Sequence, residues 1–178
     1  MADTQAAHPA ARRPGLAAMS PAYFGLVMAT GIVSLAAFLM EHRGIALGLF
    51  YLNVAQYAVL CVLYALRAIR HPRRFFGDMV AHPTGPGYFT AVAGTGVLAS
   101  QFIVIREDIA VGEALWAVTA LLWVGLTYTI FTALTVRREK PTLDKGINGG
   151  WLLAVVATQA LSVSSALLAT RIGQPHRL

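Results

Sequence analysis

The sequence repeats itself at an interval of sixty-five residues. Residues 21–33 and 86–98 share a proline, an aromatic pair and a Thr-Gly step at matching positions. The identical pairs are Pro21/Pro86, Tyr23/Tyr88, Phe24/Phe89, Val27/Val92, Thr30/Thr95 and Gly31/Gly96, and a weaker third copy sets Trp151, Val155 and Thr158 on Tyr88, Val92 and Thr95. Self-similarity at a fixed period indicates one supersecondary unit used several times.

The chain is too apolar for an ordinary soluble domain, with 57% hydrophobic and 12% charged residues among 178 and a mean hydropathy of +0.62. Five segments lack any charged residue or histidine: 22–40, 45–66, 88–105, 114–136 and 150–170. Each approaches the roughly 20 residues that cross a hydrocarbon layer as a helix. A soluble helical bundle is the alternative, but its helices would carry charges along one face. We therefore expect an all-α integral membrane protein with five transmembrane helices.

The basic residues cluster in particular loops. The formal net charge of +6 could suggest a nucleic-acid partner, but the distribution instead reports membrane topology. Basic residues precede the first segment, at Arg12 and Arg13, and fill two later loops, at Arg67, Arg70, Arg73 and Arg74 and at Arg137, Arg138, Lys140 and Lys145. The loop around Glu107 and Asp108 is acidic. The positive-inside rule predicts a multi-pass protein of the cytoplasmic (inner) membrane, with its N-terminus inside and its C-terminus outside.

The expected organisation is a single transmembrane domain over residues 20–170. Residues 1–19 are predicted to be a disordered cytoplasmic tail and residues 171–178 a short C-terminal tail. A cleaved export signal is the alternative for the N-terminal region, although segment 22–40 is long for one. The period equals one helix-loop-helix-loop unit, which predicts two and a half tandem parallel helical hairpins with the first, third and fifth helices running in the same direction.

The odd-numbered and even-numbered helices differ in composition. The odd ones are rich in small and hydroxyl residues, whereas the even ones are bulky and aromatic. Small residues allow close helix approach, and large apolar residues suit lipid, so we expect odd helices inside and even helices outside. Either the odd helices surround a path or their small residues serve packing alone. The candidate pore-lining residues are Thr30, Gly31, Ser34, Thr95, Gly96, Ser100, Thr158, Gln159 and Ser162.

The predicted spans contain no ionisable acid, base or histidine, which disfavours proton coupling through them. All five histidines fall in tails or loops and Cys61 is the only cysteine, so we expect no metal, no cofactor and no catalytic residue, and hence no enzyme. Loop arginines would raise the local anion concentration; the alternative is that they only enforce topology and touch anionic lipid. The anion-attracting candidates are Arg70, Arg73, Arg74, Arg137 and Arg138.

Three stretches carry a family resemblance: residues 21–34, the His82-Pro83 step with Tyr88-Phe89 and 94–96, and residues 140–159. Together they resemble the tellurite-resistance/dicarboxylate transporter family, which includes the slow-type anion channels of plants. The resemblance implies ten helices in five tandem hairpins, with odd helices at the pore. It also implies passage of anions such as dicarboxylates, sulfite or tellurite-related species, and trimeric assembly among channel members.

The chain departs from this pattern because it has two and a half hairpins where the family has five. The phenylalanine that occludes the pore on the family's ninth helix has no counterpart here. We expect a partial member that contacts the lipid bilayer, binds a small anion, and completes its lumen as a homo-oligomer or with a missing second half. Two hypotheses remain: part of a passive anion channel or transporter, or a non-transporting scaffold or degenerate remnant.

Overall fold

The computed structural model of the protein describes residues 15–136 and 149–172, and every regular element within them is helical. The longer helices are α1 (Gly25–Leu39), α2 (Arg43–Arg70), α3 (Pro72–Met79), α4 (Phe89–Gln101), α5 (Ile109–Val136) and α7 (Leu152–Ile172). Short 3-10 turns are η1 (Leu16–Ala18), η2 (Pro21–Phe24), η3 (Gly85–Tyr88) and η5 (Gly149–Trp151), and α4 continues as a π-helical turn, η4 (Phe102–Arg106).

Five of these helical stretches are long and apolar enough to cross a membrane, which confirms the predicted all-α membrane class. They cover Pro21–Leu39, Arg43–Arg70, Gly85–Arg106, Ile109–Val136 and Gly149–Arg171. The second is four residues longer than segment 45–66 at its C-terminal end. The prediction that Arg67 and Arg70 lie in a loop is therefore wrong, because α2 continues to Arg70.

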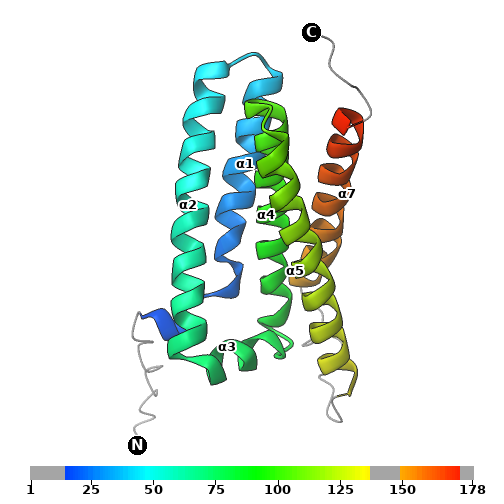
Figure 1. The fold of residues 1–178 in the computed structure, drawn as a ribbon. Helices are drawn as coiled ribbons and strands as arrows, with labels where there is room; N and C mark the ends of the chain where they lie inside the picture. Colours follow the sequence, from blue (N-terminus) through cyan, green and yellow to red (C-terminus); the bar gives the residue numbers. More distant parts are fainter. Residues whose placement is uncertain (1–14, 137–148, 173–178) are drawn as a thin grey trace, which may run out of the picture.

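The three odd-numbered spans all begin with a short 3-10 turn, and the first two also share features at both ends. Turns η2, η3 and η5 precede α1, α4 and α7, and a proline sits in the first turn of η2 and of η3, where its missing N–H costs no helical hydrogen bond. Glu41 and Glu107, just beyond α1 and η4, both adopt left-handed backbone, with φ of 66° and 56°. Figure 1 shows α1, α4 and α7 running in one direction and α2 and α5 in the other.

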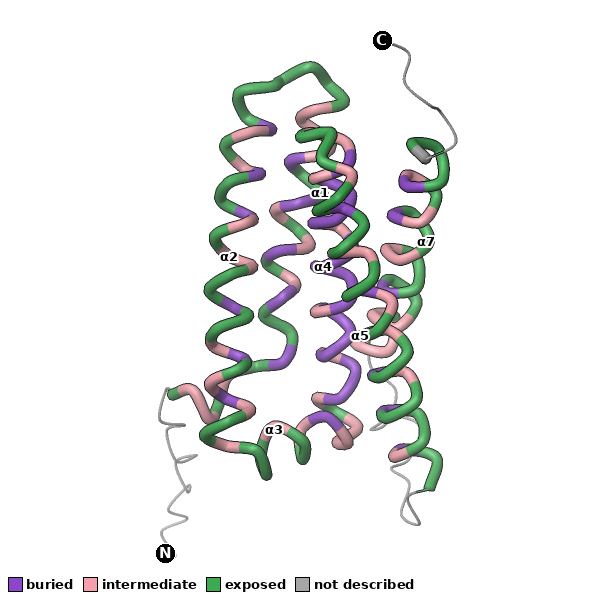
Figure 2. Tube along the Cα trace, in the orientation of Figure 1, coloured by how far each residue is buried: buried purple, intermediate pink, exposed green. Residues whose placement is uncertain are grey.

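Helix α4 lies at the centre of the bundle. In the most apolar stretch of the span that contains α4, 72% is buried, whereas the corresponding share in the other four spans is 17–28%. Figure 2 shows this concentration of buried residues along α4. Phe89 and Val92 of α4 pack with Ile130 of α5 and Ala157 of α7 in one core cluster. Helices α1 and α7 flank α4 and each leave one side exposed. The inner position predicted for α1 and α7 thus stays a prediction.

Candidate functional site: a groove between α1, α4 and α7

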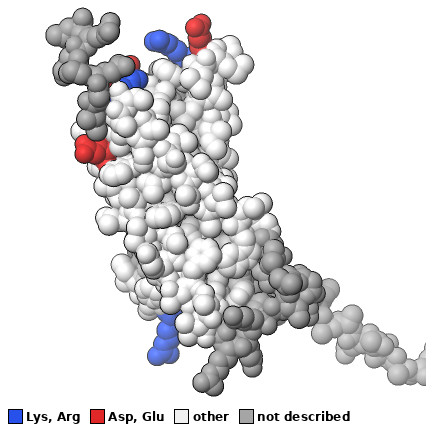
Figure 3. Space-filling view, turned by 90° about the vertical axis from the view of Figure 1, so that its right-hand side faces the viewer, with Lys and Arg blue, Asp and Glu red and all other residues white. Residues whose placement is uncertain are grey.

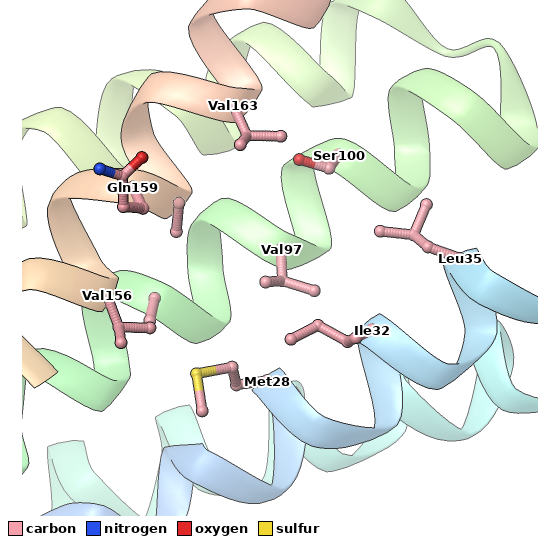
Figure 4. Close-up of a pocket in the computed structure, with 10 residues that line it drawn as sticks. Met28, Ile32, Leu35, Val97, Ser100, Val156, Gln159 and Val163 are labelled. Carbon is pink, nitrogen blue, oxygen red and sulfur yellow. The ribbon is translucent and has the colours of Figure 1, made fainter.

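The three odd-numbered helices enclose an open groove of about 240 Å³. Figure 4 shows the lining side chains of α1, α4 and α7 around the groove, with Gln159 at its edge on α7. The lining residues are Met28, Ile32, Leu35, Ala93, Val97, Ser100, Val156, Gln159, Ala160 and Val163. None of these is charged, and Ser100 and Gln159 alone among them have polar side chains. The groove is therefore largely apolar and carries no fixed charge.

Ser34 and Thr95, two of the predicted lining residues, face α2 instead of the groove. The Ser34 hydroxyl donates a hydrogen bond of 2.8 Å to the carbonyl of Ala46 on α2. Thr95 Oγ1 lies 3.1 Å from the Tyr57 hydroxyl of α2 and donates to the carbonyl of Ala91, one turn earlier in its own helix. Both side chains are buried, and their hydrogen bonds join α1 and α4 to α2.

On α7 the candidates diverge. Thr158 accepts a hydrogen bond of 2.9 Å from the Trp123 indole of α5, so its hydroxyl faces α5. Gln159 lines the groove. Ser162 is exposed on α7, and Thr30 is half-buried on α1; neither belongs to the groove lining.

Gly31 lies where α1 meets a buried amide pair. Asn53 Nδ2 of α2 donates a 2.6 Å hydrogen bond to Gln101 Oε1 of α4, and both side chains are fully buried. A Cβ on Gly31 would lie 2.5 Å from Val97 and 2.8 Å from the Asn53 amide nitrogen. The glycine thus lets α1 approach both helices. Asn53 received no role from the sequence, although an amide in an apolar helix is a signal for an interhelical contact.

Gly96 plays the same part between α4 and α7. A Cβ at this position would lie 3.1–3.2 Å from the side chain and backbone of Ala160. Gly96 therefore allows the two walls of the groove to meet backbone to backbone. Ser100 and Gln159 are the predicted residues that line the groove in the structure. Gly31 and Gly96 do not line it, but they allow the helices that form its walls to pack closely.

We expect Gly96→Leu to lower the free energy of unfolding by about 1–3 kcal/mol, because overpacking would separate α4 from α7. Gly125→Leu is the matched control on α5, since a Cβ there meets nothing within 4 Å; it should leave stability unchanged or raise it by up to about 1 kcal/mol through helix propensity. Thermal unfolding in detergent measures both. Equal losses for the two variants would show that Gly96 is not a contact point.

Arg67 forms a buried cluster that the sequence did not predict. The residue is 1% exposed and its guanidinium pairs with Asp78 of α3. It also donates to the Tyr88 hydroxyl at 3.3 Å and to the Ala17 carbonyl at 3.4 Å, and it lies 5.9 Å from the Phe75 ring centroid. The apolar residues on both sides of Arg67, which are Leu66, Ala68 and Ile69, were the signal that α2 extends past this arginine.

The five arginines predicted to attract anions separate into two groups. Arg70, at the end of α2, and Arg73 and Arg74, in α3, are exposed, whereas Arg137 and Arg138 lie outside the described residues. Figure 3 shows charged side chains near the two ends of the visible face and a broad uncharged band between them, as a bilayer requires. Within residues 15–136 and 149–172, no group of three or more His, Cys, Asp or Glu side chains could hold a metal ion.

The family described as voltage-dependent anion channel matches residues 18–178. The chain belongs to this family. The match confirms the resemblance to the tellurite-resistance/dicarboxylate transporter family. Members of the voltage-dependent anion channel family are channels and transporters, which agrees with the absence of a catalytic arrangement from the sequence.

Two curated relatives are uncharacterized transporters of Methanocaldococcus jannaschii. One is 26% identical over 152 residues and the other 27% identical over 154 residues, which covers 82% and 83% of this chain. The aligned region makes up 44% of each relative, so the chain spans less than half the length of these two transporters. No solved structure matches the chain.

Proposed function

We propose that the chain forms part of the wall of a passive path for anions, either small inorganic anions or dicarboxylates. The observation that carries this proposal is the uncharged groove between α1, α4 and α7. An apolar wall with two polar side chains, Ser100 and Gln159, lets an ion pass through weak contacts, because no fixed charge holds it. The exposed arginines near one end would raise the anion concentration at the membrane surface.

The proposed path needs a second wall. The groove is open along the exposed sides of its flanking helices, where Ile32 of α1 and Val163 of α7 are each 52% exposed. The relatives are more than twice as long as the aligned region, which supports closure by a second half of the same architecture. A homo-oligomer is the other way to close the groove. We further propose that the N-terminus lies in the cytoplasm and the C-terminus on the outer side of the inner membrane, as the positive-inside rule predicts.

A non-transporting scaffold is the second candidate. It is favoured by the hydroxyl contacts, because Ser34, Thr95 and Thr158 bind the outer helices and would persist without any transported ion. In the scaffold interpretation, Ser100 and Gln159 are simply the last polar residues of a surface that packs against lipid or another membrane helix.

A liposome flux assay with the purified chain separates the two candidates. We expect chloride, nitrate or malate to cross faster than potassium, with little dependence on a proton gradient, because no carboxylate or histidine lines the groove. Crosslinking in the same liposomes should show more than one chain per active unit. Cation-selective flux, a strict requirement for a proton gradient, or full activity from a monomer would each contradict one part of the proposal, and no flux from a crosslinked oligomer would favour the scaffold.

A further inference from the structure

Helix α3 is fixed to the bundle by its inner side. The Phe75 ring packs edge-on against Tyr88 with centroids 5.3 Å apart, and the Tyr88 hydroxyl donates a 2.8 Å hydrogen bond to the Phe75 carbonyl. Asp78 pairs with the buried Arg67, and Met79 is buried. These contacts join α3 to both α2 and η3. The fold therefore turns the opposite side of α3 away from the bundle.

The outer side of α3 and the last turn of α2 combine positive charge with exposed apolar area. Arg70, Arg73 and Arg74 are exposed, and the neighbouring apolar residues Ile69 and Phe76 are 76% and 59% exposed. We call these five residues the basic rim. Among the described residues, the ion pair found is Arg67–Asp78, and none joins a rim arginine to a carboxylate. The rim therefore presents three positive charges that are not neutralised by any described acidic residue.

The basic rim lies where a lipid headgroup would be. Figure 1 shows α3 running across the end of the bundle, between the end of α2 and the start of the α4 span. That is the level at which hydrocarbon gives way to phosphate. A short helix with arginines and a large aromatic residue on its free side suits the plane of the interface, with the aromatic ring among acyl chains and the guanidinium groups on phosphate oxygens.

We propose that the basic rim is a binding surface for anionic phospholipid headgroups. The competing role is attraction of the transported anion. The groove-lining residues all belong to α1, α4 and α7, and none belongs to α2 or α3, which favours lipid as the occupant of the rim. The proposal concerns the contact between the protein and the bilayer and holds whether or not the chain conducts anions.

Native mass spectrometry of the full chain in detergent tests the proposal, with phosphatidylglycerol and phosphatidylcholine of identical acyl chains as probes. We expect preferential retention of phosphatidylglycerol. The double variant Arg73→Gln/Arg74→Gln should lose about fivefold in phosphatidylglycerol affinity for each arginine, the factor that corresponds to roughly 1 kcal/mol per basic residue near an anionic surface. Its phosphatidylcholine retention should not change, whereas Phe76→Ser should weaken retention of both lipids.

Arg106→Gln is the matched control, because Arg106 is an exposed arginine at the opposite end of the α4 span. It should leave retention of both lipids unchanged. Equal retention of the two lipids by the unmodified chain would overturn the proposal, as would an equal loss in Arg106→Gln. A double variant that retains phosphatidylglycerol normally but slows anion flux would assign the rim to the transported anion instead. The thermal unfolding midpoint of each variant checks that the fold is intact.

Discussion

Asp78→Ala is expected to lower the free energy of unfolding by about 3 kcal/mol or more, because it leaves the Arg67 guanidinium buried without its counter-ion. The two partners differ in exposure: the Arg67 side chain is 1% exposed, whereas that of Asp78 is 38% exposed. Removing the exposed partner should therefore be the more damaging change. An unpaired carboxylate at Asp78 can be hydrated, but an unpaired guanidinium at position 67 is held between α2, η1 and η3.

The control is Arg67→Leu, which removes the buried charge and keeps apolar volume in its place. We expect a loss of only about 1–2 kcal/mol, from the hydrogen bonds to Tyr88 and Ala17. The double variant should resemble Arg67→Leu alone, because no buried charge remains to be neutralised by position 78. Thermal or denaturant unfolding in detergent measures the series. Equal losses for the two single variants, or a double variant that shows their sum, would contradict the assigned ion pair.

The number of membrane helices could be predicted from the sequence because charge-free length is a sufficient signal for a span. The end of the second helix was placed too early, since Arg67 was taken as the start of a loop although apolar residues continue beyond it. Arg67 is compatible with a helix end near the interface because Asp78, Tyr88 and Ala17 pair with the two terminal nitrogens of its guanidinium from three other segments. Those partners are 11, 21 and 50 residues away in sequence, so no local pattern reveals them.

The faces of the odd-numbered helices were harder to predict than their existence. In a bilayer a serine or threonine satisfies its hydroxyl on its own helix, as Thr95 does on Ala91 and Ser100 does on Gly96, so a hydroxyl does not require a water-filled path. Lipid and protein interior are also equally apolar, which removes the periodicity that marks the buried face of a soluble helix. Composition alone therefore could not separate Ser100, at the groove, from Thr95, against α2.

The second large effect is expected from a charge placed on the groove wall. Val97 and Thr95 are two residues apart on α4, but Val97 lines the groove and Thr95 is 1% exposed beside Tyr57. In a chain carrying Cys61→Ser, we expect Val97→Cys to react with a small negatively charged methanethiosulfonate reagent. The added sulfonate should repel a passing anion and reduce anion flux roughly tenfold or more, because a fixed charge of the same sign in a narrow path raises the barrier.

Thr95→Cys is the matched control, since it introduces the same thiol on the same helix but toward α2. The deciding measurement is anion flux through liposomes containing either variant, before and after the reagent, with mass spectrometry reporting the extent of modification. Our account predicts loss of flux in Val97→Cys and unchanged flux in Thr95→Cys. Unchanged flux in a fully modified Val97→Cys protein, or equal loss in both variants, would contradict the assignment of the groove between α1, α4 and α7 as the anion path.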